Sequence, residues 1–293
     1  MNTRIIGIII LVVAIGGTSA YFLTKNDPVE TNPLSTQPIS QNEKISLVIN
    51  TINPPESIDD LENAYKVAST SNAGRTNLYV HWSQIEPEKG NFDWRVTDIM
   101  MKLNEKYNFK TTLFFSVINA DRLGPFPTWM GNQALGETLE GETIRALDSI
   151  LSRYENIDYV IFAGDIDYHF QRASGSIPTY VEFFDDVYTE IKSKHPDVKI
   201  GNSMSLENVI NKALGPGELR ELTPSLEMGD FIALSYKPTD IVGDIDRTPQ
   251  EAITNLEQSL QIFPSQQLAF FEISWSTSAV SYTHLTLPTK RIV

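Results

Sequence analysis

The chain has 293 residues, of which 41% are hydrophobic and 20% charged, which is enough for one large globular domain with its own core or for two small ones. Its formal net charge of −14 argues against nucleic acid and against anionic lipid headgroups as partners. The absence of cysteine excludes structural disulfides and thiolate metal sites. These properties suit a domain that acts on neutral molecules, often outside the cell.

The N-terminal segment, residues 1–25, has the features of an export signal. Arg4 precedes an uncharged run, Ile5 to Leu23, whose length as a helix nearly matches a membrane core of roughly 30 Å. The basic end comes first, which predicts a cytoplasmic N-terminus and an exported body. An uncleaved signal anchor is favoured because the apolar run continues to Leu23, and a signal peptide cut near Ala20 is the alternative. We therefore predict a single-pass membrane protein with its domain outside, or a secreted protein if the segment is cleaved.

Two more segments lie outside the predicted globular domain. Residues 26–43 are rich in Pro, Asn, Gln, Ser and Thr and predict a flexible linker. Residues 281–293, SYTHLTLPTKRIV, resemble translated sequencing-adapter sequence, which predicts a non-native tail and a natural chain that continues past about Ser281. The globular domain is therefore assigned to residues 44–280.

Strand-like and helix-like segments alternate along this domain. Seven runs predict strands, at residues 45–50, 76–82, 110–117, 159–163, 198–202, 230–236 and 267–272. Helices are predicted from Ser57, over residues 94–107, 143–154 and 178–194, and from Thr248, where Thr-Pro-Gln-Glu has the form of a capping box. The alternation predicts parallel strands with crossover helices.

The spacing of the units favours an α/β fold of the (β/α)8 TIM-barrel type, because about 30 residues per unit suit a barrel of about 250 residues. A doubly wound sheet is the alternative, but residues 51–55 after the first strand form no glycine-rich phosphate cradle. Only seven of eight units are found, and the residues after Glu272 lack helical spacing. We therefore predict an incomplete barrel, truncated at its C-terminal side.

The second unit contains a long motif, W-x-x-IEPEKG-x-FDW, from Trp82 to Trp94. It resembles the retaining glycoside hydrolases of clan A, including the xylanase-like and β-galactosidase-like branches. The resemblance implies a TIM barrel that cleaves O-glycosidic bonds with two carboxylates. It also implies that the motif is partly structural, turning at Gly90 and anchoring the next helix through Trp94, and that His81 and Trp82 line the sugar site.

By the same resemblance, a glutamate at the end of the seventh strand is the nucleophile, and an Asn-Glu pair at the end of the fourth is the acid/base. Glu272 ends the seventh strand by an independent count of the strands, so it is the predicted nucleophile. The fourth strand departs from the family pattern, because Gly164-Asp165 stands where Asn-Glu is expected. Retaining hydrolysis needs two carboxyls about 5–5.5 Å apart and inverting hydrolysis about 6.5–9.5 Å, and aspartate is one methylene shorter. Three outcomes stay open: Asp165 is the acid, Asp167 is the acid, or the protein only binds glycan.

Several other side chains at predicted strand ends are candidate sugar-binding groups. They are His81, Trp82, Asn119, Asp121, Asp167, Asn202, Tyr236 and Trp275. The resemblance implies that Tyr236 hydrogen-bonds the nucleophile, although a tyrosine of the core is the other interpretation. Asn119 and Asp121 follow the third strand and Asn202 ends the fifth, where polar loop residues are also common.

One alternative chemistry uses a metal. Asp165, Asp167 and His169 alternate, so in an extended segment they would share one face and could ligate a hard or borderline metal. No second ligand cluster accompanies them, so we predict neither a metal nor another cofactor. The leading prediction is an exported, membrane-tethered glycoside hydrolase acting on an oligo- or polysaccharide. A non-catalytic carbohydrate-binding barrel and a metal-dependent TIM-barrel hydrolase are the alternatives.

Overall fold

The protein, as given by a computed structural model, is described over residues 8–10, 41–49, 57–210, 227–238 and 247–273. Its centre is a closed barrel of parallel strands in the spatial order β1-β10-β9-β8-β7-β4-β3-β2. The strands are β1 (Ile8–Ile10), β2 (Asn42–Leu47), β3 (Ala73–Tyr79), β4 (Lys110–Phe114), β7 (Ile157–Ala163), β8 (Lys199–Ser205), β9 (Phe231–Tyr236) and β10 (Leu268–Ile273). A short antiparallel hairpin, β5 (Ile118–Asn119) and β6 (Arg122–Leu123), follows β4.

The seven strands predicted from the globular domain are all present, which confirms the TIM-barrel type of fold. The place expected to be empty, between β10 and β2, is occupied by β1. Ile8 and Ile9 pair with β10, and Ile9 and Ile10 pair with β2, both in parallel. An apolar, β-branched segment suits this position because it covers two strand edges that would otherwise carry unpaired backbone groups.

The boundaries of the predicted segments change in two places. Strand β1 falls inside the predicted export signal, and β2 begins at Asn42, inside the predicted linker. The rest of residues 1–25, most of the linker and the tail 281–293 lie outside the described residues. In the part of the chain that the structure describes, no helix is both long and apolar enough to cross a membrane.

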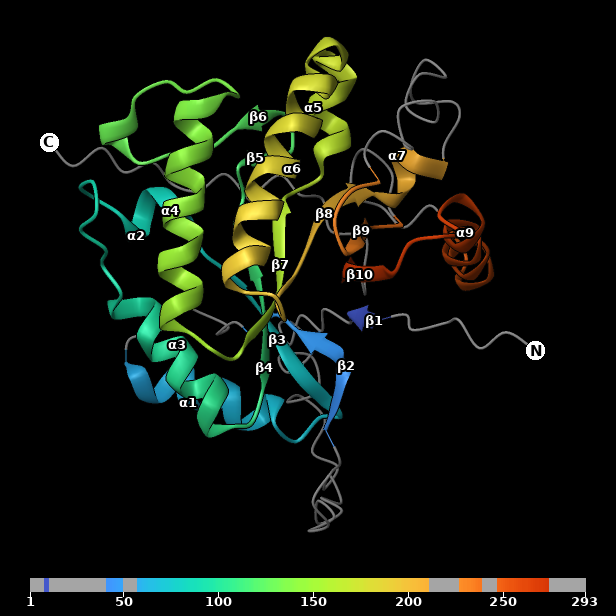
Figure 1. The fold of residues 1–293 in the computed structure, drawn as a ribbon. Coiled ribbons are helices and arrows are strands. Elements are labelled where there is room, and N and C mark those ends of the chain that lie inside the picture. The colour runs from blue at the N-terminus through green and yellow to red at the C-terminus, as the bar shows by residue number, and fades with distance from the viewer. Residues whose placement is uncertain (1–7, 11–40, 50–56, 211–226, 239–246, 274–293) are drawn as a thin grey trace, which may run out of the picture.

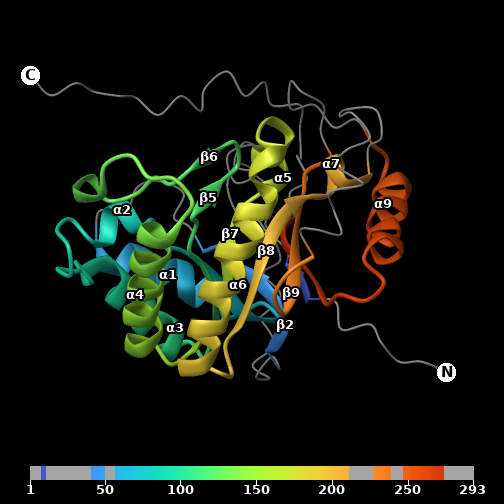
Figure 2. The ribbon, with the colours of Figure 1, turned by 45° about the horizontal axis from the view of Figure 1, so that its top comes forward.

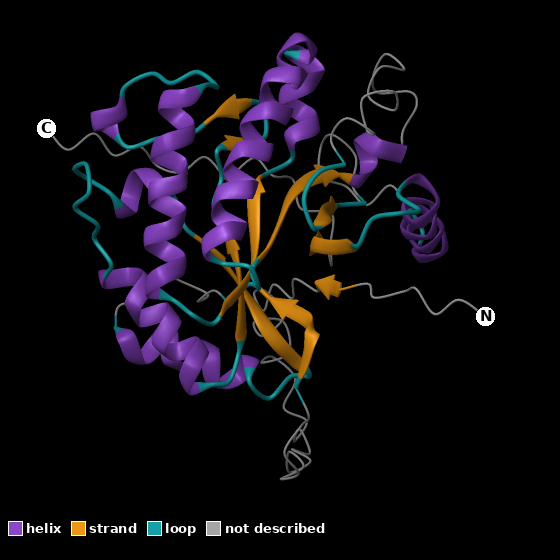
Figure 3. Ribbon diagram, in the orientation of Figure 1, coloured by secondary structure: helices purple, strands orange, loops and turns teal. Residues whose placement is uncertain are grey.

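Helices surround the barrel, with α1, α3, α4 and α6 on one side and α9 on the opposite side (Figures 1 and 2). Their bounds are α1 Ile58–Ala68, α2 Trp82–Ile85, α3 Arg95–Lys106, α4 Glu137–Arg153, α5 Ile166–Arg172, α6 Ile177–Lys194, α7 Leu206–Ile210 and α9 Pro249–Ile262, with 3-10 turns at Thr128–Met130 and Ser174–Ser176. The predicted capping boxes at Ser57 and Thr248 are both formed, with Asp60 and Glu251 as their third residues. Figure 3 separates the strands of the barrel from this outer layer by colour.

The alternation of side chains along the strands divides the core into two layers. Outward residues pack under the helices, as Phe162 of β7 does against Phe183 and Phe184 of α6. A separate cluster fills the interior of the barrel, made of Phe114, Ile161, Phe231, Ala233, Ala269 and Phe271. Strand parity therefore decides whether a residue faces the interior or the helices.

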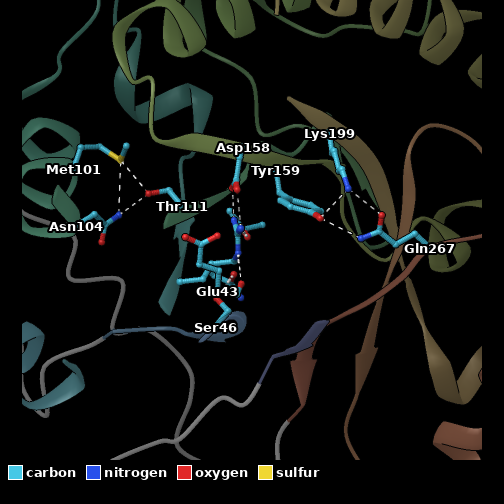
Figure 4. A network of polar contacts seen from close by, with 12 residues as sticks. Glu43, Ser46, Met101, Asn104, Thr111, Asp158, Tyr159, Lys199 and Gln267 are labelled. Atoms are coloured by element: carbon cyan, nitrogen blue, oxygen red, sulfur yellow. Dashed lines mark hydrogen bonds and ion pairs between the residues drawn. The ribbon is translucent and has the colours of Figure 1, made fainter. Parts of the chain in front are cut away.

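A polar network closes the N-terminal end of the barrel (Figure 4). Arg75 Nη2 donates to Asp158 Oδ2 at 2.8 Å, and the guanidinium lies 4.7 Å from the centre of the Tyr159 ring. Lys199 Nζ donates to the Tyr159 hydroxyl at 3.2 Å and to Gln267 Oε1 at 3.1 Å. We refer to these five residues as the N-terminal network; each of its charges faces a partner within the protein.

Candidate active site

The C-terminal ends of the strands form the opposite rim, where enzymes of this fold keep their chemistry. Asp165 follows β7 closely, and Glu272 lies one residue before the end of β10 at Ile273. Glu272 pairs with Ser235, whose hydroxyl donates to Asp165 Oδ1 at 2.8 Å, and the negative charge of Glu272 raises the pKa of Asp165. The two predicted catalytic carboxyls therefore belong to one site.

Asp165 is held by two serines from the neighbouring strands. Its backbone is left-handed, with φ 47° and ψ 49°, and its N–H donates to Ser203 Oγ at 2.9 Å. Its Oδ1 accepts from Ser203 Oγ at 3.0 Å and from Ser235 Oγ at 2.8 Å. A left-handed backbone is uncommon outside glycine, and such conformations cluster at functional sites.

The environment of Asp165 favours its protonated form. Burial is the main cause of its raised pKa, and the charge of Glu272 adds to it. The hydrogen bonds from Ser235 and Ser203 and the charge of Lys237 oppose this rise without cancelling it. A carboxyl with a raised pKa is suited to donate a proton as a general acid.

Glu272 reaches the interior because β10 is irregular. Phe270 pairs with Leu234 and Glu272 with Ser235, so one extra residue, Phe271, is inserted between them. Without this bulge, strict alternation would turn Glu272 to the same side as Phe270, toward the helices. Bulges beside active sites re-aim a side chain in this way.

The bulge is anchored from across the barrel. Asn77 on β3 donates from Nδ2 to the Phe271 carbonyl at 3.0 Å, and its Oδ1 accepts from Ser46 Oγ on β2 at 2.8 Å. Both polar side chains are buried. The backbone carbonyl at the bulge thus obtains a partner that the regular strand pairing does not provide.

Glu272 forms an ion pair at the rim. Lys237 Nζ lies 3.1 Å from Glu272 Oε1, with 54% and 26% of the two side chains exposed. The backbone N–H of Lys237 donates to Glu207 Oε1 at 3.0 Å, which fixes the segment after β9. The pair engages one carboxylate oxygen of Glu272 from the solvent side.

Glycine at position 164 is required by a neighbouring ring. A Cβ built on Gly164 would lie far closer to Phe114 Cζ than van der Waals contact allows. Phe114 belongs to the interior cluster and fills the space that a side chain at position 164 would need. The departure from the Asn-Glu pattern is therefore coupled to a phenylalanine at the end of β4.

The segment after Asp165 is helical, which corrects the expected arrangement of Asp165, Asp167 and His169. Residues two apart on a helix do not share a face, and α5 begins at Ile166. His169 Nδ1 instead lies 3.3 Å from the Asp121 carbonyl. No cluster of three or more acidic or histidine side chains in the described ranges could hold a metal ion.

Asp167 is buried and bonded within the protein. Its Oδ1 accepts from the Ser205 N–H at 2.9 Å and its Oδ2 from Asn208 Nδ2 at 2.7 Å. Burial, and then the charge of Asp165, raises its pKa to about 7. With both oxygens committed, Asp167 ties α5 to the β8–α7 connection rather than presenting a group to a sugar.

The IEPEKG motif is a structural unit, as its resemblance implied in part. Glu86 is fully buried, accepts from Trp82 Nε1 and from the Gly90 N–H, each at 2.6 Å, and lies 2.6 Å from Arg145 Nη2. Gly90 has φ 75°, a left-handed conformation that suits glycine. Trp82 is 2% exposed, which corrects its expected position at the sugar site.

Strand parity also corrects two other placements. Asn202 does not end a strand, because β8 continues to Ser205, and its Oδ1 accepts from the Tyr180 hydroxyl on α6 at 2.8 Å. Tyr236 points toward α9, where its hydroxyl accepts from Asn255 Nδ2 at 2.9 Å. Both side chains are buried on the outer face of the barrel.

The remaining predicted residues lie near the rim or beyond the described part. His81 is half-buried and precedes α2. Asn119 is in the β5–β6 hairpin, whose backbone pairs with Gly164, and Asp121 is exposed and bonds Arg172 at 3.1 Å. Trp275 lies outside the described residues.

Four residues of the site were not predicted from the sequence: Tyr79, Ser203, Ser235 and Lys237. Ser203 and Ser235 sit on the inward parity of β8 and β9, so alternation counted over the full strands would have found them. Tyr79 ends β3 on the inward face, whereas the family resemblance of this segment implies sugar-site roles only for the nearby His81 and Trp82. Lys237 had no signal in the sequence.

Comparison with known proteins gives a likeness in structure alone. No protein-family model and no curated protein sequence matches the chain. The β-glycosidase BGL167 matches over 72% of this chain and 66% of its own, with 10% identity and a TM-score of 0.52. A family 39 glycoside hydrolase from Bacteroides cellulosilyticus WH2 matches over 78% of this chain and 49% of its own, with 14% identity and a TM-score of 0.52. This chain thus spans between about half and two thirds of their length.

The catalytic domain of a β-amylase from Paenibacillus polymyxa is similar over more of its length. It matches over 80% of this chain and 86% of its own, with 9% identity and a TM-score of 0.54. At these identities the likeness shows the fold and carries no residue roles. The chain therefore has the TIM-barrel-like fold of these glycoside hydrolases.

Proposed function

We propose that the protein is a glycoside hydrolase that uses Asp165 as its acid/base and Glu272 as its nucleophile. The observation that carries this proposal is the pair of carboxyls at one rim of the barrel in different environments. Both residues are partly exposed, but burial of the Asp165 carboxyl raises its pKa, whereas Glu272 is ion-paired with Lys237. A carboxyl with a raised pKa suits the acid role, and a carboxylate held by an ion pair at the same rim suits the nucleophile role.

The proposed reaction has two steps. In the first, Glu272 attacks the anomeric carbon and forms a glycosyl ester, while the bond to the leaving oxygen breaks and Asp165 gives that oxygen a proton. In the second, Asp165 takes a proton from water, the water oxygen bonds to the anomeric carbon, and the ester bond to Glu272 breaks. The sugar leaves with its original anomeric configuration, and both carboxyls return to their starting states.

The substrate class is proposed as an oligo- or polysaccharide. The rim offers a half-buried aromatic side chain, Tyr79, and an exposed one, Tyr168, beside the carboxyls. Aromatic faces and polar groups together suit sugar rings, which present both C–H faces and hydroxyls. The fold likeness to a β-glycosidase and to a family 39 glycoside hydrolase supports the same class.

A second candidate is a carbohydrate-binding barrel without turnover. Two observations favour it. Lys237 holds Glu272 in an ion pair, and Asp165 is shorter than the glutamate that the resemblance leads one to expect. Both would slow hydrolysis while leaving a sugar-binding rim intact.

The test measures turnover of aryl glycosides and polysaccharides by the protein and by its E272Q and D165N variants. Matched controls are E257Q on α9 and D186N on α6, which change exposed carboxyls away from the rim. Turnover lost in E272Q and D165N but kept in the controls supports the proposal, and the anomer of the first product decides whether configuration is retained. Full turnover by E272Q overturns it.

A rescue experiment separates the nucleophile from a merely structural glutamate. In E272A, added azide can enter the space left by the carboxylate and attack the anomeric carbon directly. Formation of a glycosyl azide of inverted configuration supports Glu272 as nucleophile. Glycan binding by the unmodified protein with no turnover of any substrate supports the binding barrel instead.

Export to the cell surface is proposed from the sequence of residues 1–25 alone. The backbone of Ile8–Ile10 cannot pair with β10 and β2 and lie in a membrane helix at the same time, so the two states are alternatives for one segment. Fractionation of cells and mass spectrometry of the mature N-terminus distinguish an anchor, a cleaved signal and a retained strand. Recovery of the intact chain in the cytoplasmic fraction would rule out export.

A further inference from the structure

We infer that Tyr79 is the positioning residue that links the two carboxyls of this site. This inference rests on the proposed function and adds to it a residue that sets how Glu272 and Asp165 are spaced and ionised. Tyr79 is the last residue of β3, faces the interior and is half-buried. Its ring therefore borders both the core of the barrel and the open rim.

The ring of Tyr79 belongs to a group of three. Its centre lies 5.0 Å from that of Phe114 and 5.7 Å from that of Phe271, and the Phe114 and Phe271 rings stack 5.2 Å apart. Tyr79 and Phe114 are also direct partners in the pairing of β3 with β4. We call these three residues the aromatic triad. Such ring contacts add to burial and resist sliding of one strand end past another.

Each phenylalanine of the triad supports one carboxyl. Phe271 is the extra residue of the bulge and immediately precedes Glu272. Phe114 lies against Gly164, the residue immediately before Asp165. Tyr79 contacts both rings, so a change in its position alters the two backbone segments that carry the carboxyls.

The hydroxyl of Tyr79 lies in the field of both acids. Burial is the main cause of its raised pKa, and the charges of Glu272 and Asp165 raise it further, so the hydroxyl stays protonated at neutral pH. A protonated hydroxyl can donate a hydrogen bond, and in the inferred role it donates to one of these carboxylates. Other titratable groups near the two carboxyls are Lys237, which pairs with Glu272, Asp167, whose pKa the charge of Asp165 raises, and Glu207, which accepts from the Lys237 N–H. The neutral Ser203 and Ser235 bind Asp165.

The N-terminal end of the barrel supplies a matched tyrosine. Tyr159 also faces the interior and packs on a phenylalanine, with its ring centre 5.2 Å from that of Phe231. Its hydroxyl, however, receives hydrogen bonds from Lys199 and Gln267 and lies at the opposite end from both carboxyls. A change at Tyr159 therefore reports the loss of a buried hydroxyl without an effect on the site.

The first test compares Y79F with Y159F by kcat, KM and the pH dependence of kcat/KM. Removing a donor from an ionised carboxylate disfavours its charged form, so Y79F should move the acidic limb to higher pH and lower kcat about tenfold, with little change in KM. Y159F should leave kcat and both limbs unchanged. Wild-type kcat and limbs in Y79F, or the same shifts in Y159F, overturn the inference. The Y79F variant keeps the ring, and its melting temperature checks that the fold is kept.

The second test does not need turnover. The carboxyl carbons of Glu272 and Asp165 can be titrated by NMR in the unmodified protein, in Y79F and in Y159F, with E272Q and D165N giving the assignments. An upward shift of one or both carboxyl titrations in Y79F alone supports the positioning role, even if the protein hydrolyses no tested substrate. Superimposable titrations in all three proteins overturn it, whatever the outcome for the proposed function.

Discussion

The two ends of this barrel are built from similar residues and differ in how those residues are satisfied. Each end has an inward tyrosine, at least one carboxyl group and a lysine, but in the N-terminal network every charged group is hydrogen-bonded within the protein (Figure 4). At the C-terminal rim Lys237 pairs with Glu272, while burial raises the pKa of Asp165. Residue type alone therefore does not separate the structural network from the candidate site.

The cations at the two ends of the barrel also differ in how exposed their side chains are. The side chain of Arg75 is 3% exposed against its partner Asp158, whereas that of Lys237 is 54% exposed against Glu272. A buried, forked guanidinium fixes its partner's geometry, while an exposed ammonium can be displaced by a ligand. In barrels of this type the N-terminal end serves stability and the C-terminal end chemistry. The following changes test that division.

The largest effect is expected from D165N. An asparagine cannot donate the proton that the leaving oxygen needs, so kcat should fall by about a thousandfold, within the range of general acid catalysis. Stability should not fall, because a buried carboxyl that resists ionisation is replaced by a neutral group of the same shape. Steady-state kinetics and thermal melting check both parts. A large loss of stability with unchanged kcat would place Asp165 with the structural end instead.

The next largest effect is a pH dependence of the free energy of unfolding, which is expected from Asp167. Its pKa is raised from 3.8 to about 7 in the fold, so between these values the native state binds more protons than the unfolded one. The free energy of unfolding should therefore fall as pH rises from about 4 to about 7, by up to about 4 kcal/mol at about 1.4 kcal/mol per pKa unit.

Urea unfolding at a series of pH values measures this slope, and D167N provides the control. The amide introduced by D167N keeps one acceptor for the Ser205 N–H but cannot ionise, so the stability of this variant should vary less over the same interval. Equal slopes in the two proteins would show that another group dominates the pH dependence.

The next prediction is a loss of stability from a change in the N-terminal network. In R75M, Asp158 loses its bidentate partner and Tyr159 loses the cation above its ring. Removing one partner of a buried pair costs about 3–5 kcal/mol, but Asp158 is a third exposed and can be hydrated, so we expect about 2 kcal/mol. Chemical denaturation measures the loss, and kcat per folded molecule should stay the same. A fall in kcat at constant stability would remove the distinction between the ends.

The sequence predicted most of the fold because the fold depends on periodicity. Seven strands, the capping boxes at Ser57 and Thr248 and the rank of Glu272 on the seventh strand all follow from local patterns. The eighth strand position could not be predicted, because Ile8–Ile10 pairs with strands far away in the chain. Pairing between distant segments leaves no periodic signal in either one.

The site was predicted less completely, because its membership depends on which face of a strand each side chain lies on and on local irregularities in the strands. The sequence predicts a strand end at Asn202, but β8 ends three residues later, at Ser205, and Tyr236 lies on the outward side of the same rim. The bulge at Phe271 turns Glu272 to the inward face of the strand, and no residue type in Phe-Phe-Glu predicts a bulge there. The helix after Asp165 likewise separates side chains that an extended segment would align.

The smallest effect is expected at Asn77, where the two ends of the barrel meet on one strand. Arg75, Asn77 and Tyr79 lie in alternate positions on the inward side of β3. Arg75 belongs to the N-terminal network, Asn77 donates to the bulge, and Tyr79 belongs to the aromatic triad. N77A leaves the buried Phe271 carbonyl without its donor, which should cost about 1–2 kcal/mol of stability.

The same change should lower kcat severalfold, because a loosened bulge no longer fixes Glu272 toward the interior. The control is S46A, which removes the hydrogen bond to Asn77 Oδ1 and leaves the bond to the bulge in place. If N77A loses stability and keeps full kcat, then Asn77 belongs with Arg75 as a structural residue. If kcat falls in N77A and not in S46A, the division between a stabilising end and a reactive end begins at the middle of β3.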